Sequence, residues 1–294
     1  MKTTVGLIGL GLMGQPMAMN ILRGGFELVV YNRTPSRADR AVQAGARLAQ
    51  SARELASQCD VVMSIVSDPP ALEACLWGPD GALAGLRQGS VLVDSSTVSP
   101  ALARRAAAAC AERGASFLDA PVTGGTWGAE KGELVFMVGG EAPVLERCRP
   151  VLSTMGKRLL HLGPHGSGQV VKLAMNLILA LEVDALAEAL ALVRGAGVEA
   201  SKLIDVLQAS MARAAVLDIK APLMLQERYE PSFPLRLMHK DLGLALELGN
   251  QVGVPLPATA AAREVYGAVR AEATEDLDYA AVARFWQRPS KSRP

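Results

Sequence analysis

Two different patterns of apolar residues divide this chain. Up to about residue 163, short runs rich in Val, Ile and Leu alternate with Ala-rich stretches that have helical spacing. The runs are Val5–Leu10, Leu28–Asn32, Val61–Val66, Val91–Asp94, Ser116–Asp119, Leu134–Val138 and Leu159–Leu162. Strands separated by helices form βαβ units, and continuous apolar runs suit a parallel sheet that is covered on both faces. The pattern therefore predicts an α/β domain with a doubly wound sheet, whose helices include Met13–Arg23, Ser99–Arg113 and Ala142–Met155.

The second pattern begins after the segment Gly163–Gly168 and contains no further strand runs. Residues Ser167–Arg194 predict one long helix that is apolar nearly all round. Because such a helix needs neighbours on every side, we expect it to form the centre of an all-helical domain and to be covered in part by another subunit. Further helices are predicted at Ser201–Ala209, Ala214–Gln226, Met238–Val252, Thr259–Ala271 and Tyr279–Phe285.

These patterns divide the chain into three predicted parts. Residues 1–163 are expected to form the sheet domain, and residues 164–286 an all-helical domain for substrate binding and oligomerisation. Residues 287–294 are expected to be a disordered tail. The oligomer expected from the long apolar helix is a homodimer or a homotetramer.

The composition of the 294 residues argues against several kinds of partner. The net charge is only +1, so no strong field would attract nucleic acid or a membrane surface. The apolar stretch Leu173–Leu181 is shorter than the roughly 20 residues that span a bilayer. The four cysteines lie far apart, without the CxxC spacing of metal or redox sites. We therefore expect a soluble, cytoplasmic protein with reduced thiols and no metal.

A glycine-rich string follows the first predicted strand. The residues Gly9-Leu10-Gly11-Leu12-Met13-Gly14 match G-x-G-x-x-G, and a helical pattern follows them. In a dinucleotide-binding Rossmann turn, Gly9 would permit the tight turn, Gly11 the approach of a pyrophosphate, and Gly14 close packing of helix on strand. The alternative is a structural turn without a ligand. The strand and helix on either side favour the dinucleotide.

The end of the second predicted strand bears on the choice between NAD and NADP. An acidic residue there would hydrogen-bond the ribose 2′-hydroxyl and repel a 2′-phosphate. This chain instead has Asn32, Arg33 and Thr34. Arg33 can pair with a phosphate and Thr34 can donate a hydrogen bond, although Arg33 could also be an ordinary surface residue. The sequence therefore favours NADP, with NAD still possible.

Polar residues within the long apolar helix indicate reactive chemistry. Lys172 and Asn176 lie four residues apart and so share one helix face. They are costly in an apolar stretch unless they are paired or line a cleft. The structural alternative is a lysine that extends to solvent beside an asparagine that satisfies a backbone carbonyl. Two strand-end segments, 94–97 and 119–125, add hydroxyls, carboxylates and glycines at the edge where open α/β sheets bind ligands.

The motifs together resemble those of the β-hydroxyacid dehydrogenase family, and the resemblance reaches to about residue 286. They are GLIGLGLMGQPMAMNIL at the start, DSSTVSP at 94–100, DAPVTGG at 119–125, GSGQVVKLAMN at 166–176 and HKDL at 239–242. Members of this family include 3-hydroxyisobutyrate, tartronate semialdehyde and 4-hydroxybutyrate dehydrogenases. The resemblance implies a Rossmann domain followed by an all-helical domain, as in 6-phosphogluconate dehydrogenase. This chain is a poor match to 6-phosphogluconate dehydrogenase itself, because that enzyme needs a larger helical domain and more basic groups to bind the substrate phosphate.

The resemblance also implies a role for each residue of the site. Lys172 would be the general acid/base and Asn176 would orient the substrate oxygen. The substrate, a small carboxylate, would contact Thr123, Gly124, Gly125, Lys240, Asp241 and Phe233, with Asp241 fixing the position of Lys240. The cofactor would contact Gly9, Gly11, Leu12, Met13, Gly14, Asn32, Arg33, Thr34, Val66, Ser67, Ala71, Thr97 and Lys240. Of these, Thr97 would contact it near the nicotinamide. The reaction would transfer a hydride between NADP(H) and a hydroxy acid or its semialdehyde or keto acid partner.

Two departures from the family pattern concern the substrate. Thr123 stands where the family usually has serine, and Trp127 is bulky for the loop after the double glycine. Small semialdehyde acids such as succinic semialdehyde rank first as substrates and 3-hydroxyisobutyrate second. One alternative is an imine reductase of the same fold, and another is a non-catalytic NADP-binding module that recognises a partner. Lys172 argues against both, because relatives of these kinds generally lack the lysine.

Overall fold

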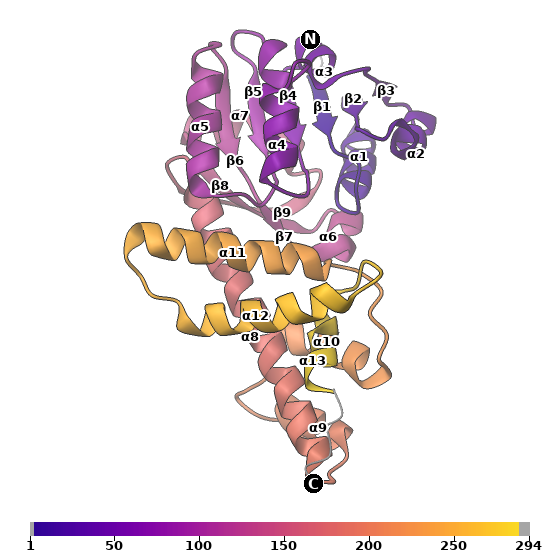
Figure 1. Cartoon of the computed structure of the whole chain (residues 1–294). Coiled ribbons are helices and arrows are strands. Elements are labelled where there is room, and N and C mark those ends of the chain that lie inside the picture. The colour runs from indigo at the N-terminus through magenta and orange to yellow at the C-terminus, as the bar shows by residue number, and fades with distance from the viewer. Residues whose placement is uncertain (1–2, 288–294) are drawn as a thin grey trace. The chain divides into compact units, whose positions relative to one another are not determined.

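The structure of the protein is a computed structural model that describes residues 3–287 (Figure 1). The chain separates into two compact units, the first ending at Lys172 and the second beginning at Leu173. The division falls within the long helix α8 (Ser167–Gly195), a little after the Gly163–Gly168 segment. Each unit is described by itself below.

Unit 1 is built on one nine-stranded sheet within the described residues. Its strands are β1 (Thr4–Ile8), β2 (Glu27–Tyr31), β3 (Arg47–Leu48), β4 (Val61–Ser64), β5 (Val91–Asp94), β6 (Ser116–Asp119), β7 (Val122–Thr123), β8 (Leu134–Gly140) and β9 (Gly156–Gly163). The order β3-β2-β1-β4-β5-β6 is parallel throughout. β8 then runs antiparallel to β6 and β7 and parallel to β9. This is the doubly wound order of a Rossmann sheet.

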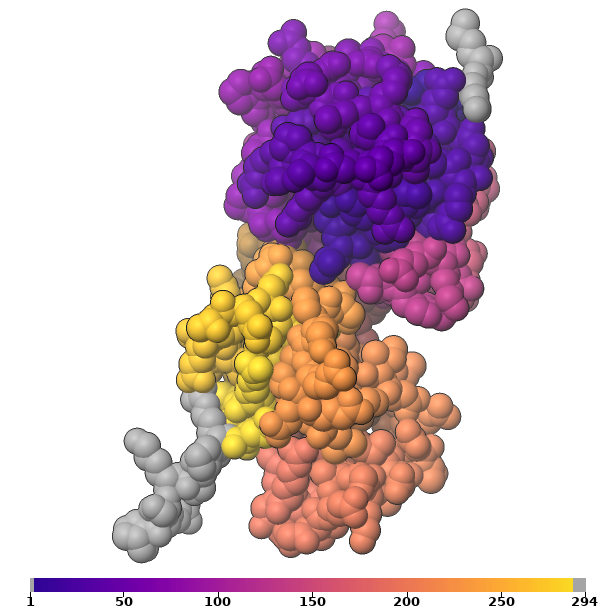
Figure 2. Space-filling view, turned by 90° about the vertical axis from the view of Figure 1, so that its right-hand side faces the viewer, coloured from indigo at the N-terminus to yellow at the C-terminus, as the bar shows by residue number. Residues whose placement is uncertain are grey.

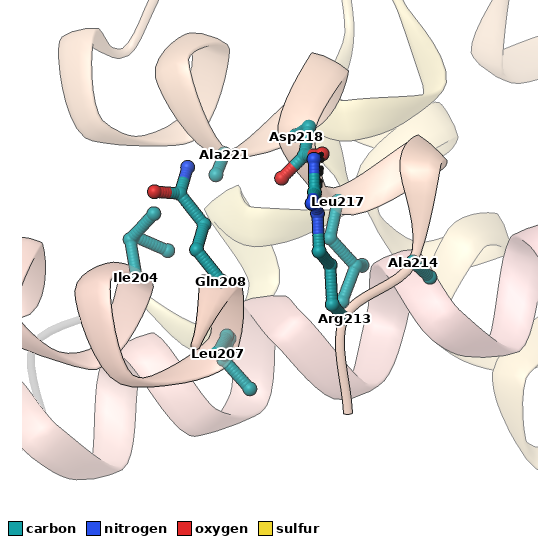
Figure 3. A pocket seen from close by; sticks show the side chains of 8 residues that line it. All are labelled: Ile204, Leu207, Gln208, Arg213, Ala214, Leu217, Asp218 and Ala221. Carbon is teal, nitrogen blue, oxygen red and sulfur yellow. Dashed lines mark hydrogen bonds and ion pairs between the residues drawn. The ribbon is translucent and has the colours of Figure 1, made fainter. Parts of the chain in front are cut away.

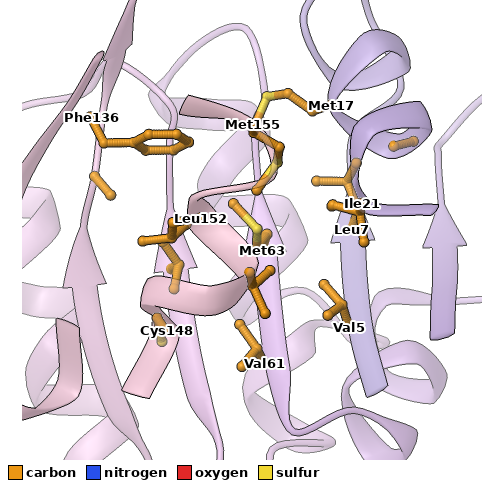
Figure 4. Close-up of a cluster of buried hydrophobic side chains, with 14 of the residues drawn as sticks. Val5, Leu7, Met17, Ile21, Val61, Met63, Phe136, Cys148, Leu152 and Met155 are labelled. Carbon is orange, nitrogen blue, oxygen red and sulfur yellow. The ribbon is translucent and has the colours of Figure 1, made fainter. Parts of the chain in front are cut away.

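Helices cover both faces of the sheet, as the continuous apolar runs predict. They are α1 (Gly14–Arg23), α2 (Asp39–Gln43), α3 (Ala52–Gln58), α4 (Pro69–Trp77), α5 (Pro100–Ala111), α6 (Gly125–Lys131) and α7 (Ala142–Leu152), with short 3₁₀ turns at Pro35–Ala38 and Ala82–Ala84. Side chains alternate along each strand. In β1, Val5 and Leu7 pack with residues of α1 and α7 (Figure 4), whereas Ile8 packs with residues of α3, α4 and α5 on the other face.

Several of these helices begin at a polar side chain that accepts a backbone hydrogen bond. Ser51 accepts from Glu54, Asp68 from Ala71, and Ser99 from Leu102. Proline follows at the start of α4 and α5, where its missing N–H costs nothing. These caps fix where the helices after β4 and β5 begin, and so position the loops that precede them.

Within its described residues, the secondary-structure elements of unit 2 are helices. The unit contains the rest of α8, then α9 (Ala200–Gln208), α10 (Ala215–Gln226), α11 (Leu235–Val252), α12 (Pro257–Glu272), a 3₁₀ turn (Tyr279–Val282) and α13 (Ala283–Trp286). Its core contains Tyr266, which is fully buried and donates a hydrogen bond from its hydroxyl to the carbonyl of Ala180 at 3.2 Å. A buried ion pair joins Lys220 to Asp278 at 2.8 Å.

The fold confirms the predicted α/β class and the single long helix, which ends one residue after the predicted end. The apolar patterns do not predict β3, β7, α2, α3, α4 and α6, all of which are short. The predicted disordered tail lies, from residue 288 on, outside the described residues. No helix within residues 3–287 is both long enough and apolar enough to cross a membrane. Cys59, Cys110 and Cys148 are buried, and burial raises the pKa of each thiol to about 12.

Candidate functional site

Five strand ends of unit 1 line up in one row. The register pairs Tyr31 with Ile8, Ile8 with Ser64, Ser64 with Asp94, and Asp94 with Asp119. Because the strands are parallel, each segment that follows one of these residues leaves the sheet at the same, carboxyl edge. Ligands of open α/β sheets bind at this edge. The glycine turn and the segments after residues 31, 64, 94 and 119 are therefore neighbours.

The glycine turn has the geometry that a pyrophosphate site requires. Gly9 has φ +98° and donates a hydrogen bond from its N–H to the carbonyl of Tyr31 at 2.9 Å. A Cβ at Gly14 would lie 1.9 Å from the carbonyl oxygen of Gly9, so helix and turn touch there. A Cβ at Gly11 would meet nothing within 4 Å. Gly9 and Gly14 are thus needed for the fold of the turn, whereas Gly11 leaves space beside the backbone at the start of α1, where an anion is favoured.

Asn32 holds the segment after β2 against the glycine turn. Its side-chain oxygen accepts a hydrogen bond from the N–H of Leu10 at 2.8 Å, and its amide nitrogen donates to the carbonyl of Thr34 at 2.8 Å. Arg33 and Thr34 are exposed, and so are Ser36 and Arg37 in the turn that follows. Arg37 is not among the predicted cofactor residues. Its carbonyl accepts a hydrogen bond from the side chain of Gln15 in α1, which holds this turn beside the glycine string.

A buried polar network joins the ends of β4 and β5. Asp94 accepts hydrogen bonds from the hydroxyls of Ser64 at 2.8 Å and Ser96 at 2.7 Å. The Ser96 hydroxyl in turn accepts from the N–H of Val66 at 2.9 Å. Burial raises the pKa of Asp94 to about 6, although these hydrogen bonds oppose the rise. The network fixes the course of the predicted cofactor segment at Val66.

The neighbouring predicted cofactor residues, Ser67 and Ala71, surround the start of α4. Asp68 accepts hydrogen bonds from the Ser67 hydroxyl at 2.6 Å and from the N–H of Ala71 at 2.9 Å. Ser67 therefore lies in the connection between β4 and α4, next to Val66, and Ala71 lies in the first turn of α4.

Asp119, at the end of β6, holds the start of α8. One carboxylate oxygen accepts from the N–H of Gly166 at 2.7 Å and the other from the N–H of Gln169 at 3.2 Å. Burial raises the pKa of this carboxyl group. A Cβ at Gly168 would lie 2.3 Å from the carbonyl oxygen of Met137, which explains the glycine at that position. The side chain of Gln169 continues to the segment that contains Thr97, which is half-buried.

The predicted carboxylate loop follows β7. Thr123 is the last residue of this strand and is half-buried, whereas Gly124 and Gly125 are exposed and have φ of +124° and +61°. Only glycine adopts the first of these conformations readily. Trp127 is 59% exposed, and the ammonium of Lys131 lies 4.2 Å from the centroid of its ring.

In unit 2, three predicted site residues form one connected group. Asn176 of α8 donates a hydrogen bond from its side-chain amide to Asp241 of α11 at 2.6 Å, and both residues are buried. The other oxygen of Asp241 lies 3.0 Å from the ammonium of Lys240. Asp241 therefore contacts both Lys240 and Asn176, and the contact with Asn176 has no signal in the sequence. Lys172 is one turn before Asn176 on the same continuous helix and shares its face.

Phe233 lies in the segment before α11 and takes part in a separate contact. Its N–H donates to Asp278 at 3.1 Å, and its ring meets that of Tyr279 edge to face with the centroids 5.8 Å apart. No hydrogen bond, ion pair or ring contact described above joins Phe233 to Asn176, Lys240 or Asp241.

The hollow drawn in Figure 3 is elsewhere in unit 2. It lies between α9 and α10, where Ile204, Leu207 and Leu217 line it and Arg213 pairs with Asp218 at 3.0 Å. None of the predicted site residues contributes to it. We assign no part of the predicted chemistry to this hollow, because its charged lining residues, Arg213 and Asp218, pair with each other.

Comparison with known proteins agrees with this geometry. Residues 4–163 match the NAD binding domain of 6-phosphogluconate dehydrogenase, and residues 166–286 match the NAD-binding region of NADP-dependent 3-hydroxyisobutyrate dehydrogenase. The chain is 36% identical to 2-(hydroxymethyl)glutarate dehydrogenase of Eubacterium barkeri over 285 residues, which cover 97% of this chain and 95% of the relative. It is 35% identical to 2-hydroxy-3-oxopropionate reductase of Escherichia coli (strain K12) over 280 residues, covering 95% and 96%.

A solved structure has the same fold. Mycobacterium tuberculosis 3-hydroxyisobutyrate dehydrogenase, described with L-serine, is 33% identical with a TM-score of 0.89, covering 98% of this chain and 100% of the other. These similarities extend over both units. This chain therefore belongs to the β-hydroxyacid dehydrogenase family and is an NAD(P)-dependent hydroxyacid dehydrogenase.

Proposed function

We propose that this dehydrogenase works with NADPH to reduce a small semialdehyde or keto acid that carries a carboxylate, and that Lys172 is its general acid. The observation that carries the proposal is the arrangement on α8. Lys172 shares a helix face with Asn176, and Asn176 is held by the same carboxylate that pairs with Lys240. The family supplies the reaction class, and these polar groups supply candidates for the chemistry.

The preference for NADPH is supported by the segment after β2. The adenosine ribose of a dinucleotide in a Rossmann fold lies beside this segment. Here it offers the guanidinium groups of Arg33 and Arg37 and the hydroxyls of Thr34 and Ser36, all exposed. Asn32 replaces the acidic residue that would repel a phosphate, and its amide already binds Leu10 and Thr34. Two cations and two hydroxyls suit a 2′-phosphate.

In the direction of reduction, the bound cofactor supplies a hydride to the substrate carbon. The chain then has to supply a proton to the carbonyl oxygen, and Lys172 would give it from Nζ, leaving a neutral amine that takes a proton back from water. Asn176 would orient the same oxygen. Its amide nitrogen donates to Asp241, so the orientation of its side chain is fixed before substrate binds. The exposed backbone at Gly124 and Gly125, with the Thr123 hydroxyl, would receive the substrate carboxylate.

The first test is NADPH oxidation against a panel of small semialdehyde and keto acids, with NADH in parallel. We expect one semialdehyde, with succinic semialdehyde and 2-hydroxy-3-oxopropionate as the first candidates, to be reduced with NADPH preferred. A preference for NADH would contradict the role of Arg33 and Arg37. Turnover of cyclic imines but of none of the acids would indicate an imine reductase instead.

Lys172→Met tests the general acid, with Lys202→Met as the matched control, because Lys202 is an exposed lysine of α9. Loss of a general acid typically lowers kcat by about 10²- to 10⁴-fold, while NADPH should bind the Met variant normally. A kcat for Lys172→Met within threefold of that of the control would exclude the assigned role. Normal NADPH binding with no turnover by the wild type would favour a non-catalytic module.

We also propose that the chain forms a homodimer or homotetramer in the cytoplasm. In unit 2, more than half of the surface of each of five apolar residues is exposed. They are Ile178, Leu192, Val206, Met211 and Ile219. Figure 2 shows part of this surface, where the segment with α9 and α10 is salmon and orange. Exposed apolar side chains on this scale are typical of subunit interfaces.

A further inference from the structure

One buried side chain outside the predicted site holds the segment that contains Thr97. Gln169, in the first turn of α8, has no exposed surface. Its side-chain oxygen accepts a hydrogen bond from the N–H of Val98 at 3.1 Å, and its amide nitrogen donates to the carbonyl of Ser96 at 2.8 Å. The two bonds are made to the residues on either side of Thr97, so the side chain of Gln169 bridges this short segment. We call this pair of hydrogen bonds the clasp.

The glutamine amide meets both requirements of this site. The site needs an acceptor for an N–H and a donor for a carbonyl, side by side, and a primary amide offers one of each. The orientation of the amide is therefore fixed by its partners. Ser96 and Val98 are buried, so water cannot replace either bond easily.

Gln169 is itself held from behind. Its N–H donates to Asp119 at 3.2 Å, and the same carboxylate accepts from Gly166 at 2.7 Å. Ser96 is held by Asp94 and binds Val66. The clasp thus connects the ends of β4, β5 and β6 to the first turn of α8. Lys172 is three residues further along this helix and lies on the same side as Gln169.

We infer that Gln169 is a positioning residue for hydride transfer, which sets the place of Thr97 beside the nicotinamide relative to the helix that carries Lys172. This inference rests on the proposed function, because the family resemblance places Thr97 against the nicotinamide end of the cofactor. The glycine turn, which would bind the pyrophosphate, makes no hydrogen bond described here with Gln169. Loss of the clasp should therefore affect how the nicotinamide is seated more than how tightly the dinucleotide binds.

The test uses two substitutions in the full-length protein. Gln169→Met keeps the length and removes both hydrogen bonds. Gln169→Glu keeps the shape, and its protonated form can still accept from Val98 and donate to Ser96, whereas its ionised form cannot donate. Burial beside Asp119 favours the protonated form of the new carboxyl group. Gln43→Met is the matched control, because Gln43 is an exposed glutamine of α2 in the same unit.

Two readouts are compared with thermal unfolding. The first is kcat with saturating NADPH and substrate, and the second is the fluorescence increase of NADPH at saturation, which reports how firmly the nicotinamide is held and needs no turnover. For Gln169→Met we expect kcat to fall about tenfold or more and the fluorescence increase to be reduced, with the Kd of NADPH changed less than threefold. For Gln169→Glu, we expect both readouts, relative to wild type, to recover as the pH is lowered.

A purely structural role gives a different result. Both variants would then unfold at a lower temperature, yet below that temperature they would keep the wild-type kcat and fluorescence, and Gln169→Glu would follow the wild type at every pH. That result would overturn the inference. If Gln169→Met does not fold, the pH dependence of Gln169→Glu decides alone. If the wild type reduces none of the acids, the proposed function fails, but the fluorescence comparison still decides the role of Gln169.

Discussion

One added methyl group should have different effects at two glycines of the same turn. At Gly14 it should lower the stability of the fold, and at Gly11 it should weaken cofactor binding. At Gly14, a Cβ would lie 1.9 Å from the carbonyl oxygen of Gly9, so Gly14→Ala must push the helix away from the turn. At Gly11, a Cβ would meet nothing within 4 Å, so Gly11→Ala should leave the protein folded and fill the space beside the backbone that a pyrophosphate would approach.

The magnitudes follow from these contacts. Overpacking of this kind costs about 1–3 kcal/mol, and about 1 kcal/mol lowers the melting temperature of a chain of this size by roughly 2–4 °C. We therefore expect Gly14→Ala to melt about 2–12 °C below wild type. For Gly11→Ala we expect an unchanged melting temperature. If one charge-assisted hydrogen bond to the pyrophosphate is lost, at about 1.5–3 kcal/mol, the Kd for NADPH should rise about ten- to a hundredfold.

The assay is a thermal melt of the free protein together with a fluorescence titration with NADPH. Gly195→Ala is a suitable control, because a Cβ there also meets nothing within 4 Å and Gly195 lies at the end of α8. Wild-type NADPH affinity in Gly11→Ala would refute the assignment of the pyrophosphate to this turn. A wild-type melting temperature in Gly14→Ala would refute the close contact between helix and turn.

Three further predictions concern charge and assembly. The pKa of Asp94 rises on folding from 3.8 to about 6, so protonation of this carboxyl group stabilises the folded state. The free energy of unfolding should therefore fall as the pH rises from about 4 to about 6. Urea titrations at several pH values should show this slope in the wild type and a flatter one in Asp94→Asn. Lys220→Met leaves the buried carboxylate of Asp278 without its cation and should cost about 3–5 kcal/mol in urea unfolding, whereas a loss below about 1 kcal/mol would show that the pair matters little. Light scattering should give two or four times the 30.9 kDa of one chain, and Ile219→Asp should lower that mass; a single-chain mass for the wild type would rule out the proposed oligomer.

The sequence predicts the fold well where the signal is long or local. Continuous apolar runs of Val, Leu and Ile predict buried parallel strands, and the long apolar stretch from Ser167 predicts one continuous helix, α8. The glycine string predicts its own geometry, since Gly9 needs a positive φ and Gly14 a close contact. In each case the local structure is determined by residues that are close in the sequence, or by a single repeating pattern of apolar residues.

The missed elements depend on neighbours that are distant in the sequence. β3 has two exposed residues, Arg47 and Leu48, and becomes a strand only because β2 offers a free edge. α3, with Ala52–Gln58, is too short to show a clear period, and its cap at Ser51 is the remaining local signal. Helix propensity and apolar spacing say little about such short segments.

The same limit applies to the site. Individual residues such as Lys172 and Asn176 are prominent because a polar side chain in an apolar helix is unusual. Their partners are not prominent. Asp241 is 65 residues from Asn176, and Gln169 is 71 residues from Val98, and neither spacing carries a signal. The sequence therefore indicates candidates for the chemistry, whereas the structure identifies what orients them.

Asp94 and Asp119 are partners in the register of β5 and β6, and this has a consequence for how the sheet edge titrates. Both carboxyl groups are buried, and the charge of Asp119 contributes to the raised pKa of Asp94. Burial is the main cause of the raised pKa in both groups, and the Asp119 charge adds a smaller contribution at Asp94. The edge of the sheet that faces the first turn of α8 therefore carries two carboxyl groups whose ionisation is opposed by their surroundings. The hydrogen bonds from Ser64 and Ser96 to Asp94, and from Gly166 and Gln169 to Asp119, act in the other direction, so the hydroxyl and backbone donors at this edge favour the charged forms.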